Sequence, residues 1–233
     1  MKVLLAGDTH GDLPHVAYLL GTAAQQGCDR IVQVGDFGYW PHVEPFHDQV
    51  AAAARTAAID IYWLDGNHEN FDALETVVDM AATEPQRMLD NLWYLARGAA
   101  WEWDGCRFVS LGGAPSVDKE QRVEGSTWWP QELLTESQVT RAQARIADVL
   151  LTHDAPDGVC PIIGPWYKGD PLSTHHRQLI SAVADAVQPK LLVHGHYHYR
   201  YTGAYGRTRV EGLGRNSQEE DSWMVLDTAD WAS

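Results

Sequence analysis

Residues 191–200 read Leu-Leu-Val-His-Gly-His-Tyr-His-Tyr-Arg. The apolar run Leu191–Val193 has the composition of a buried strand, and it stops at a group of histidines. The group consists of His194, His196 and His198. Gly195 has no side chain, so the backbone can bend there and neighbouring imidazoles could converge instead of alternating across a strand. Imidazole is the commonest metal ligand, so the stretch indicates a metal site, although a surface histidine run or core histidines would give the same letters.

Length and composition restrict the class of protein. The chain has 233 residues with 45% hydrophobic content, which predicts one domain spanning residues 1–233. Its formal charge is −15, with 32 acidic residues against 17 lysines and arginines. This balance excludes a broad groove for long duplex nucleic acid as the expected partner. A small phosphorylated substrate is compatible with it if bound cations reverse the local field.

No segment predicts a membrane or an extracellular location. The first apolar run, Lys2–Ala6, is too short for a signal sequence, and no apolar run reaches membrane-spanning length. Three widely separated cysteines without a Cys-x-x-Cys pair do not indicate a disulfide framework. We therefore expect a cytoplasmic protein without a membrane partner; the sequence leaves the oligomeric state open.

The first third of the chain repeats a strand-then-helix unit. Strands are predicted at 3–6, 30–34 and 61–64, and helices at 13–26, 44–58 and 71–78. Such alternation favours an α/β sheet with largely parallel strands. Polar residues follow each strand: Asp8-Thr9-His10, then Gly35-Asp36, then Gly66-Asn67-His68. Loops at the carboxyl ends of parallel strands form ligand crevices, so we expect these side chains to meet, while Asp12 suits a helix N-cap.

The remaining chain adds shorter strands and one long loop. Strands are predicted at 92–95, 99–103 and 107–111, with a turn at Asp104-Gly105, and again at 148–151 before His153. A helix with a Thr-x-x-Gln capping box is predicted at 135–145. The loop 112–130 contains Lys119, Arg122 and a tryptophan pair. A substrate-facing lid and a tryptophan pair covering a satellite cluster are both compatible with it.

The strand-end side chains together have the chemistry of a metal centre. They are Asp8, His10, Asp36, Asn67, His68, His153, His194 and His196. Oxygen donors mixed with imidazoles suit manganese first, with iron, nickel, cobalt or zinc as alternatives. The supply exceeds the needs of one ion, which predicts two divalent metal ions that share a carboxylate. Such pairs, roughly 3.5–4 Å apart, serve in-line displacement at phosphorus.

Five sequence blocks resemble the signature of the calcineurin-like metallophosphoesterases. The blocks are Asp8-x-His10, Gly35-Asp36, Gly66-Asn67-His68-Glu69, His153 and His194-Gly195-His196, in that order. The resemblance implies a four-layer αββα sandwich, in which two mixed β-sheets pack face to face and the metal site lies at the carboxyl ends of the strands.

The resemblance also implies a role for each residue. Asp8, His10 and His196 would bind one metal, and Asn67, His153 and His194 the other. Asp36 would bridge the two ions and hold the attacking hydroxide with them, so Asp36 and His68 are the expected catalytic residues. His68 would steady the developing charge on phosphorus or protonate the leaving oxygen, and it would contact substrate together with Asn67. Lys119 and Arg122 are expected as cationic substrate contacts from their loop position.

One departure narrows the implied activity. Many members carry Asp and then Arg where this chain has Tyr39 and Trp40, which disfavours a protein phosphatase. We therefore expect a phosphodiesterase acting on a nucleotide or cyclic nucleotide type of molecule. A phosphomonoesterase, a nuclease on short single strands and a non-catalytic binding scaffold are the alternatives. His198 and His47 are placed outside the site.

Overall fold

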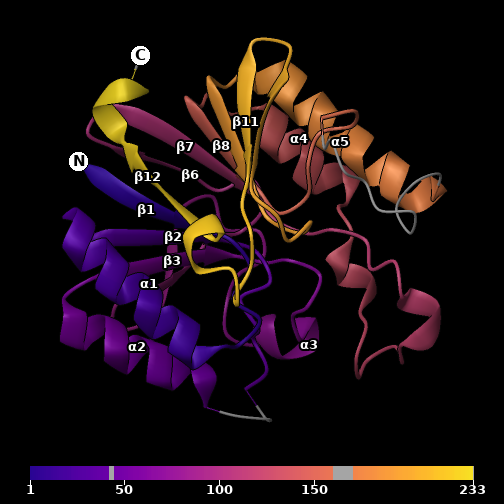
Figure 1. Ribbon diagram of the computed structural model, residues 1–233. Coiled ribbons are helices and arrows are strands. Elements are labelled where there is room, and N and C mark those ends of the chain that lie inside the picture. The colour runs from indigo at the N-terminus through magenta and orange to yellow at the C-terminus, as the bar shows by residue number, and fades with distance from the viewer. Residues whose placement is uncertain (42–44, 160–169, 233) are drawn as a thin grey trace.

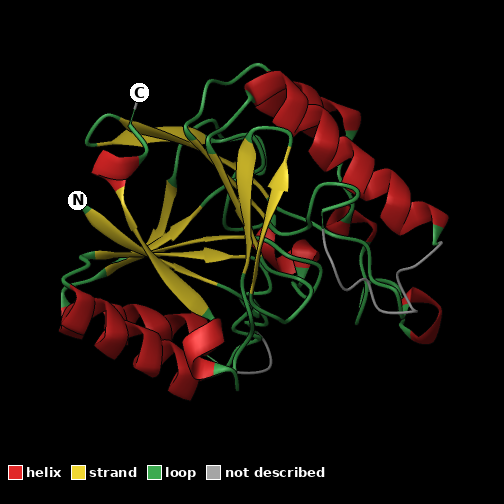
Figure 2. Cartoon of the chain, turned by 45° about the horizontal axis from the view of Figure 1, so that its top comes forward, coloured by secondary structure: helices red, strands yellow, loops and turns green. Residues whose placement is uncertain are grey.

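Two six-stranded β-sheets pack face to face, and helices cover both outer faces (Figures 1 and 2). The computed structural model describes residues 1–41, 45–159 and 170–232. The four-layer sandwich of two mixed sheets implied by the sequence is thereby confirmed.

The first sheet contains the predicted strand-then-helix repeats. Its strands are β1 (Lys2–Ala6), β2 (Arg30–Val34), β3 (Asp60–Leu64), β4 (Gln86–Leu89), β5 (Leu92–Tyr94) and β12 (Trp223–Asp227). They lie in the order β12-β1-β2-β3-β5-β4, with β1, β2, β3 and β5 parallel and an antiparallel strand at each edge. Helices α1 (Leu13–Gln26) and α2 (Phe46–Ala57) cover its outer face (Figure 1).

The second sheet repeats this plan with different chain connections. Its strands are β6 (Ala100–Trp103), β7 (Cys106–Leu111), β8 (Val149–Thr152), β9 (Leu191–His194), β10 (Tyr201–Tyr205) and β11 (Thr208–Gly212). The order is β10-β11-β9-β8-β7-β6, again with four parallel strands between antiparallel edges. Helices α4 (Glu136–Gln143) and α5 (Pro171–Val187) pack on its outer face.

The central strands are apolar on both faces because they lie between two layers. In β1, Val3 and Leu5 point into the interface between the sheets, whereas Leu4 and Ala6 pack under α1 and α2. Successive side chains of a strand alternate between faces, so a strand that is covered on both sides reads as a continuous apolar run. This is the pattern by which the sequence identified β1, β2 and β3.

Some predicted elements differ in extent. Helix α3 (Phe71–Leu74) is one turn long and does not reach residue 78. Thr76 donates its hydroxyl to the carbonyl of Ala73, which competes with continued helix formation. The helix predicted from Glu44 begins at Phe46, and residue 44 lies outside the described residues. Strand β4 was not predicted, and β5 joins the first sheet.

Short helices and the capping signals complete the fold. The 3-10 helices are η1 (Lys119–Gln121), η2 (Pro130–Glu132), η3 (Glu219–Asp221) and η4 (Thr228–Asp230). The Thr135–Gln138 capping box and the Asp12 N-cap are confirmed. Cys28 and Cys106 are buried free thiols, and Cys160 lies outside the described residues. Within the described ranges, none of the helices combines the length and the apolar character needed to cross a bilayer.

Candidate metal centre

The candidate ligands lie just beyond the carboxyl ends of parallel strands from both sheets. Asp8 follows β1, Asp36 follows β2 and Asn67 follows β3, all from the first sheet. His153 follows β8 and His196 follows β9 in the second sheet. Because the sheets pack face to face, these five loops meet at one edge of the sandwich, as expected for a ligand crevice in an α/β fold.

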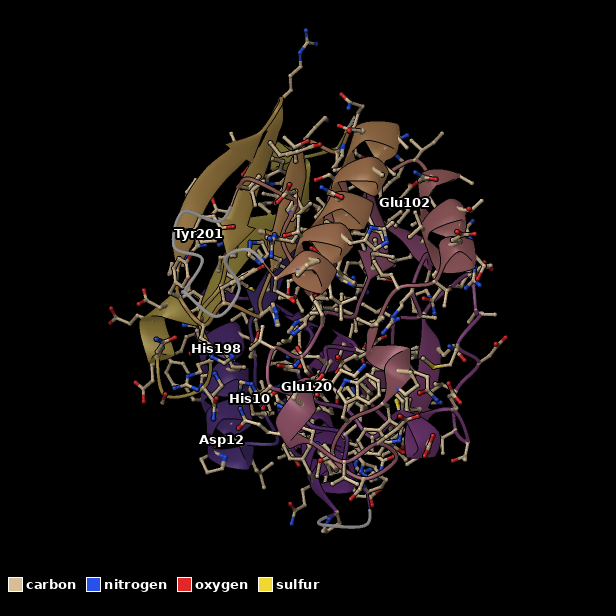
Figure 3. The ribbon with its side chains drawn as sticks, turned by 90° about the vertical axis from the view of Figure 1, so that its right-hand side faces the viewer. His10, Asp12, Glu102, Glu120, His198 and Tyr201 are labelled. Atoms are coloured by element: carbon tan, nitrogen blue, oxygen red, sulfur yellow. The ribbon has the colours of Figure 1, made fainter. Side chains whose placement is uncertain are left out.

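One group of ligand atoms is centred on Asp8. The donor atoms of Asp8, His10, Asp36 and His198 all lie within 4.8 Å of one another. His198 Nε2 lies 3.0 Å from Asp8 Oδ2, and His10 Nε2 lies 3.4 Å from Asp36 Oδ2. Figure 3 shows the His10 and His198 side chains next to each other, and their ring centroids are 5.1 Å apart. Two carboxylates and two imidazoles around one point suit a divalent cation.

A second group of donors faces the other oxygen of Asp36. His153 Nε2 lies 3.3 Å from Asp36 Oδ1 and 3.2 Å from Asn67 Oδ1. The other ring nitrogen, Nδ1, lies 2.9 Å from the carbonyl of Val34, which can only accept, so Nδ1 carries the hydrogen. The lone pair on Nε2 of a neutral ring therefore points at two oxygen acceptors. The His196 ring centroid is 5.0 Å from that of His153.

This arrangement requires positive charge between the donors. Asp8 and Asp36 are buried, and among the described residues the Oδ2 atom of each accepts no hydrogen bond of ordinary geometry. Burial by itself would lower the pKa of His10, but Asp36 and Asp8 outweigh it and raise that pKa to about 9. For His153 burial is likewise outweighed, chiefly by Asp36, and the pKa is about 10. Protons on these imidazoles thus balance the carboxylates, and a metal cation fits the same position.

Two further histidines are held neutral. Burial, reinforced by His153, lowers the pKa of His196 to about 3. Burial also dominates at His194, where the pKa is about 4. A neutral imidazole keeps a lone pair that can bind a metal, provided no protein atom already uses it.

His194 does not meet that condition in the structure. The Nδ1 of His194 lies 2.9 Å from the Gly195 carbonyl, and its Nε2 lies 2.6 Å from the Tyr201 hydroxyl, so both nitrogens have protein partners. His198, which the sequence interpretation placed outside the site, belongs to the Asp8 group. His198 is therefore a candidate ligand, which the sequence interpretation did not expect. The spacing Gly195-His196-Tyr197-His198 was the available signal.

Four ligand candidates have left-handed backbone. Positive φ angles occur at His10 (48°), Asp36 (56°), His196 (68°) and His198 (61°). Residues other than glycine rarely adopt this conformation, and such positions cluster at functional sites. The turn at His196 and His198 breaks strand alternation, which allows alternate histidines to approach different groups of donors.

Two glycines allow the loops to approach closely. A Cβ at Gly195 would collide with Asp8 Oδ1, and a Cβ at Gly66 would collide with Asp36 Oδ1. Close backbone approach of this kind requires a residue without a side chain. Both glycines therefore contribute to placing a carboxylate that belongs to another loop.

Glu69 fixes the loop that carries Asp36. Its buried carboxylate accepts the backbone N–H groups of Phe37 (2.7 Å), Gly38 (3.1 Å) and Tyr39 (2.6 Å). Burial and the nearby Asp36 raise the pKa of Glu69 to about 8, while the N–H groups of Tyr39 and Phe37 act in the opposite direction. Aromatic residues occupy the places of the missing Asp and Arg: Tyr39 is buried, and Trp40 Nε1 donates to the carbonyl of His68 (3.0 Å).

A cavity of about 340 Å³ opens onto the donors. The strand-end loops and the loop 112–130 both contribute to its lining, which consists of Asp36, Asn67, His68, Ser116, Val117, Asp118, Gln121, Arg122, His196 and His198. The terminal nitrogens of Arg122 lie 3.1 and 3.3 Å from the two ring nitrogens of His68, so the guanidinium contacts both of them. Arg122 also forms an ion pair with Asp118, in which Nε lies 2.8 Å from Oδ1. Lys119 instead lies over the Trp128 ring at 4.1 Å and does not line the cavity.

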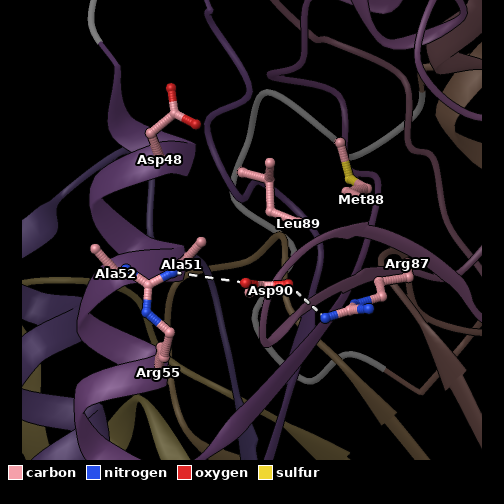
Figure 4. A pocket seen from close by; sticks show the side chains of 8 residues that line it. All are labelled: Asp48, Ala51, Ala52, Arg55, Arg87, Met88, Leu89 and Asp90. Carbon is pink, nitrogen blue, oxygen red and sulfur yellow. Dashed lines mark hydrogen bonds and ion pairs between the residues drawn. The ribbon is translucent and has the colours of Figure 1, made fainter.

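A larger cavity of about 560 Å³ lies between α2 and β4 (Figure 4). Asp90 forms ion pairs there with Arg55 (3.7 Å) and with Arg87. None of the candidate metal ligands lines this cavity. The cavity that the candidate metal ligands line is therefore the smaller one, of about 340 Å³.

Two contacts to the ligand residues were not predicted from the sequence. Asn216 Oδ1 lies 3.0 Å from His10 Nδ1, and its amide nitrogen donates to Asp12 Oδ2 (3.1 Å). Ser116 Oγ accepts a hydrogen bond from Asn67 Nδ2 (3.1 Å). No local motif marks either residue, because each contacts a ligand that is distant in sequence.

Comparisons with known proteins agree with this fold. A family model described as calcineurin-like phosphoesterase matches residues 1–200. The structure resembles TT1561 of Thermus thermophilus (TM-score 0.60, 14% identity, covering 97% of this chain and 98% of that one). It also resembles a dimetal phosphatase from Danio rerio (TM-score 0.62, 14% identity, 97% and 91% covered). A third similar fold is GAP50, the anchor in the inner membrane complex of Plasmodium (TM-score 0.51, 13% identity, 92% and 71% covered). A search of curated proteins finds no match to this chain.

Proposed function

The chain belongs to the calcineurin-like phosphoesterase family, and from this premise we propose that it hydrolyses a small phosphodiester with two divalent metal ions. A nucleotide or cyclic nucleotide type of molecule is the proposed substrate class, and manganese is the proposed metal. The cavity of about 340 Å³ and the net charge of −15 support a small substrate over a long nucleic acid.

The position of Asp36 carries the proposal. Its Oδ2 faces His10 Nε2 at 3.4 Å, and its Oδ1 faces His153 Nε2 at 3.3 Å. One buried carboxylate thus faces both groups of donors, as a bridging ligand must. We assign the first ion to Asp8, His10, Asp36 and His198, and the second to Asp36, Asn67, His153 and His196. His194 leaves the ligand set that the sequence implied, because both of its nitrogens have protein partners.

The ions supply, when bound, an activated water and charge neutralisation for in-line attack at phosphorus. The remaining residues position the substrate. Asn67, His68 and Arg122 line the cavity from two sides, where they can donate hydrogen bonds to phosphate oxygens. Burial, together with Arg122 and neighbouring histidines, lowers the pKa of His68 against the opposing effect of Asp36. A neutral His68 suits stabilisation of developing charge by an N–H donor better than full proton transfer.

The test compares two chromogenic substrates on the metal-loaded protein. We expect Mn²⁺-dependent hydrolysis of bis(4-nitrophenyl) phosphate to exceed that of 4-nitrophenyl phosphate. His68→Ala should lower kcat on the diester by about 10²–10³-fold, the effect of removing one preorganised donor. His175→Ala, an exposed position on α5, is the matched control and should retain activity. Preference for the monoester would move the assignment to a phosphomonoesterase.

Two alternatives have distinct signatures. A nuclease on short single strands would bind oligonucleotides with an affinity that falls steeply with salt. A binding scaffold would bind both ions and hydrolyse neither ester, with His68→Ala leaving its properties unchanged. Fold similarity alone leaves the scaffold open, since both a phosphatase and an anchor protein share this architecture.

A further inference from the structure

A buried chain of hydrogen bonds connects Glu132 to the side chain of Asn67. Ser116 Oγ donates to Glu132 Oε2 (2.7 Å), and Ser116 Oγ lies 3.1 Å from Asn67 Nδ2. The backbone N–H of Ser116 donates to the other carboxylate oxygen, Oε1 (2.7 Å). Glu132 is fully buried and Ser116 is 6% exposed, so water does not compete freely for these bonds.

The direction of each bond follows from its atoms. A carboxylate only accepts, so the single hydroxyl hydrogen of Ser116 is directed to Glu132. The Ser116 oxygen then has only lone pairs to offer to Asn67. The side chain of Asn67 must consequently present its NH₂ group to Ser116 and its Oδ1 to the opposite side, where His153 Nε2 lies at 3.2 Å.

We propose that Glu132 and Ser116 are positioning residues that set the orientation of the Asn67 amide, so that its oxygen and not its nitrogen faces the second ion. The inference rests on the proposed function, which assigns Asn67 and His153 to that ion. The two faces of an amide differ only in hydrogen-bonding character, and a nitrogen that carries two hydrogens cannot bind a cation.

A second set of bonds ties Glu132 to the loop that carries Asn67. Arg97 pairs with Asp65 through Nη2 at 2.6 Å, and its guanidinium also donates to the carbonyls of Gln131 (2.8 Å) and Leu133 (2.8 Å). Asp65 lies two residues before Asn67. The segment around Glu132 is thus held against the Asn67 loop independently of Ser116. This keeps Glu132, Ser116 and Asn67 within hydrogen-bonding distance, and we call these three residues the relay.

The relay makes an unusual prediction for the nearly isosteric change Glu132→Gln. The Ser116 N–H can only donate, so it will hold the amide oxygen of the new glutamine and leave the glutamine NH₂ facing Ser116 Oγ. The Ser116 hydroxyl must then direct its hydrogen to Asn67, which reverses the preferred orientation of the Asn67 amide. Glu132→Gln should therefore lower the affinity for the second ion at least as much as Ser116→Ala does, because Ser116→Ala only removes the orienting group.

The experiment titrates metal-free protein with Mn²⁺ by isothermal calorimetry, with the unfolding temperature of each metal-free variant measured alongside. Wild type should bind two ions. Ser116→Ala and Glu132→Gln should each weaken one of them by about 10–100-fold, the usual effect of outer ligand partners. Ser110→Ala removes a buried hydroxyl that donates to the carbonyl of Ala96, and as a control it should leave both affinities unchanged.

The double variant separates the relay from a general packing effect. Without the Ser116 hydroxyl, Glu132→Gln can no longer reverse the amide, so Ser116→Ala/Glu132→Gln should bind metal like Ser116→Ala alone. Additive losses, or a Glu132→Gln protein with wild-type affinity for both ions, would overturn the relay. If the wild-type protein binds only one ion, and both substitutions weaken its binding, the two-ion proposal is overturned and the relay is supported. Wild type without measurable Mn²⁺ binding would overturn both.

Discussion

Replacing Arg97 by methionine should lower the free energy of unfolding of the metal-free protein by about 3–5 kcal/mol, because it leaves a buried carboxylate without its cation. Arg97 is 1% exposed, and its Nε and Nη2 atoms donate to Asp65 at 2.8 and 2.6 Å. Asp65 is fully buried and retains one other donor, the hydroxyl of Tyr94 (2.7 Å). Methionine fills much of the same volume, so the loss reports charge and hydrogen bonds more than packing.

Arg107→Met provides the comparison. The side chain of Arg107 is 34% exposed and pairs with Asp148, which also has Lys190 at 3.6 Å. The cost there should be smaller, about 1 kcal/mol, because the guanidinium is partly exposed and Lys190 still pairs with the buried Asp148. Urea unfolding followed by tryptophan fluorescence in the presence of a chelator measures both variants. Equal losses for the two substitutions would refute the reasoning. Asp65→Asn in the Arg97→Met background should recover part of the loss by removing the unpaired charge.

The remaining predictions concern the metal centre. Asp36→Asn should retain the fold, since asparagine tolerates left-handed backbone, yet lower kcat by at least about 10²–10³-fold; an active variant with both ions bound would contradict the bridging role. Asn216→Ala should weaken the ion bound by His10 about 10–100-fold in a Mn²⁺ titration, because the ring loses the partner of its Nδ1; an unchanged titration would exclude that role. Gly195→Ala should weaken metal binding because the new Cβ collides with Asp8 Oδ1, and wild-type affinity would show that the loop can shift without cost.

The sequence predicted the fold well where local signals are strong. The predicted bounds of α1 agree with the structure because Asp12 caps its start and Gly27, with a φ of 72°, ends it. Strand β4 and the end of α3 lack comparable signals. The single domain over residues 1–233 and the cytoplasmic location stay predictions.

The site was predicted by residue type and less well by geometry. Strand β9 extends to His194, one residue beyond the predicted strand, and the ligands that we propose from the following loop are therefore His196 and His198 instead of His194 and His196. Of the expected cationic contacts, Arg122 lines the cavity and Lys119 does not. Asn216 and Glu132 were beyond the reach of sequence patterns, because Asn216 contacts His10 from a distant part of the chain and Glu132 reaches Asn67 only through Ser116.

The left-handed backbone at four candidate ligands must be stabilised by the rest of the structure. Each such position costs about 1–3 kcal/mol and persists only where the surrounding structure holds it in place. Buried hydrogen bonds oppose this cost. Asp36 Oδ1 accepts the N–H groups of Asn67 (2.8 Å) and His68 (2.9 Å), and Asp8 Oδ1 accepts that of His196 (3.1 Å).

All of these bonds use protein atoms alone. Each carboxylate holds a neighbouring loop with one oxygen and directs the other toward an imidazole, so it positions backbone and binds cation at the same time. The donors are therefore arranged before a metal arrives, and binding does not have to order the loops. Loss of either carboxylate would release a loop as well as a ligand.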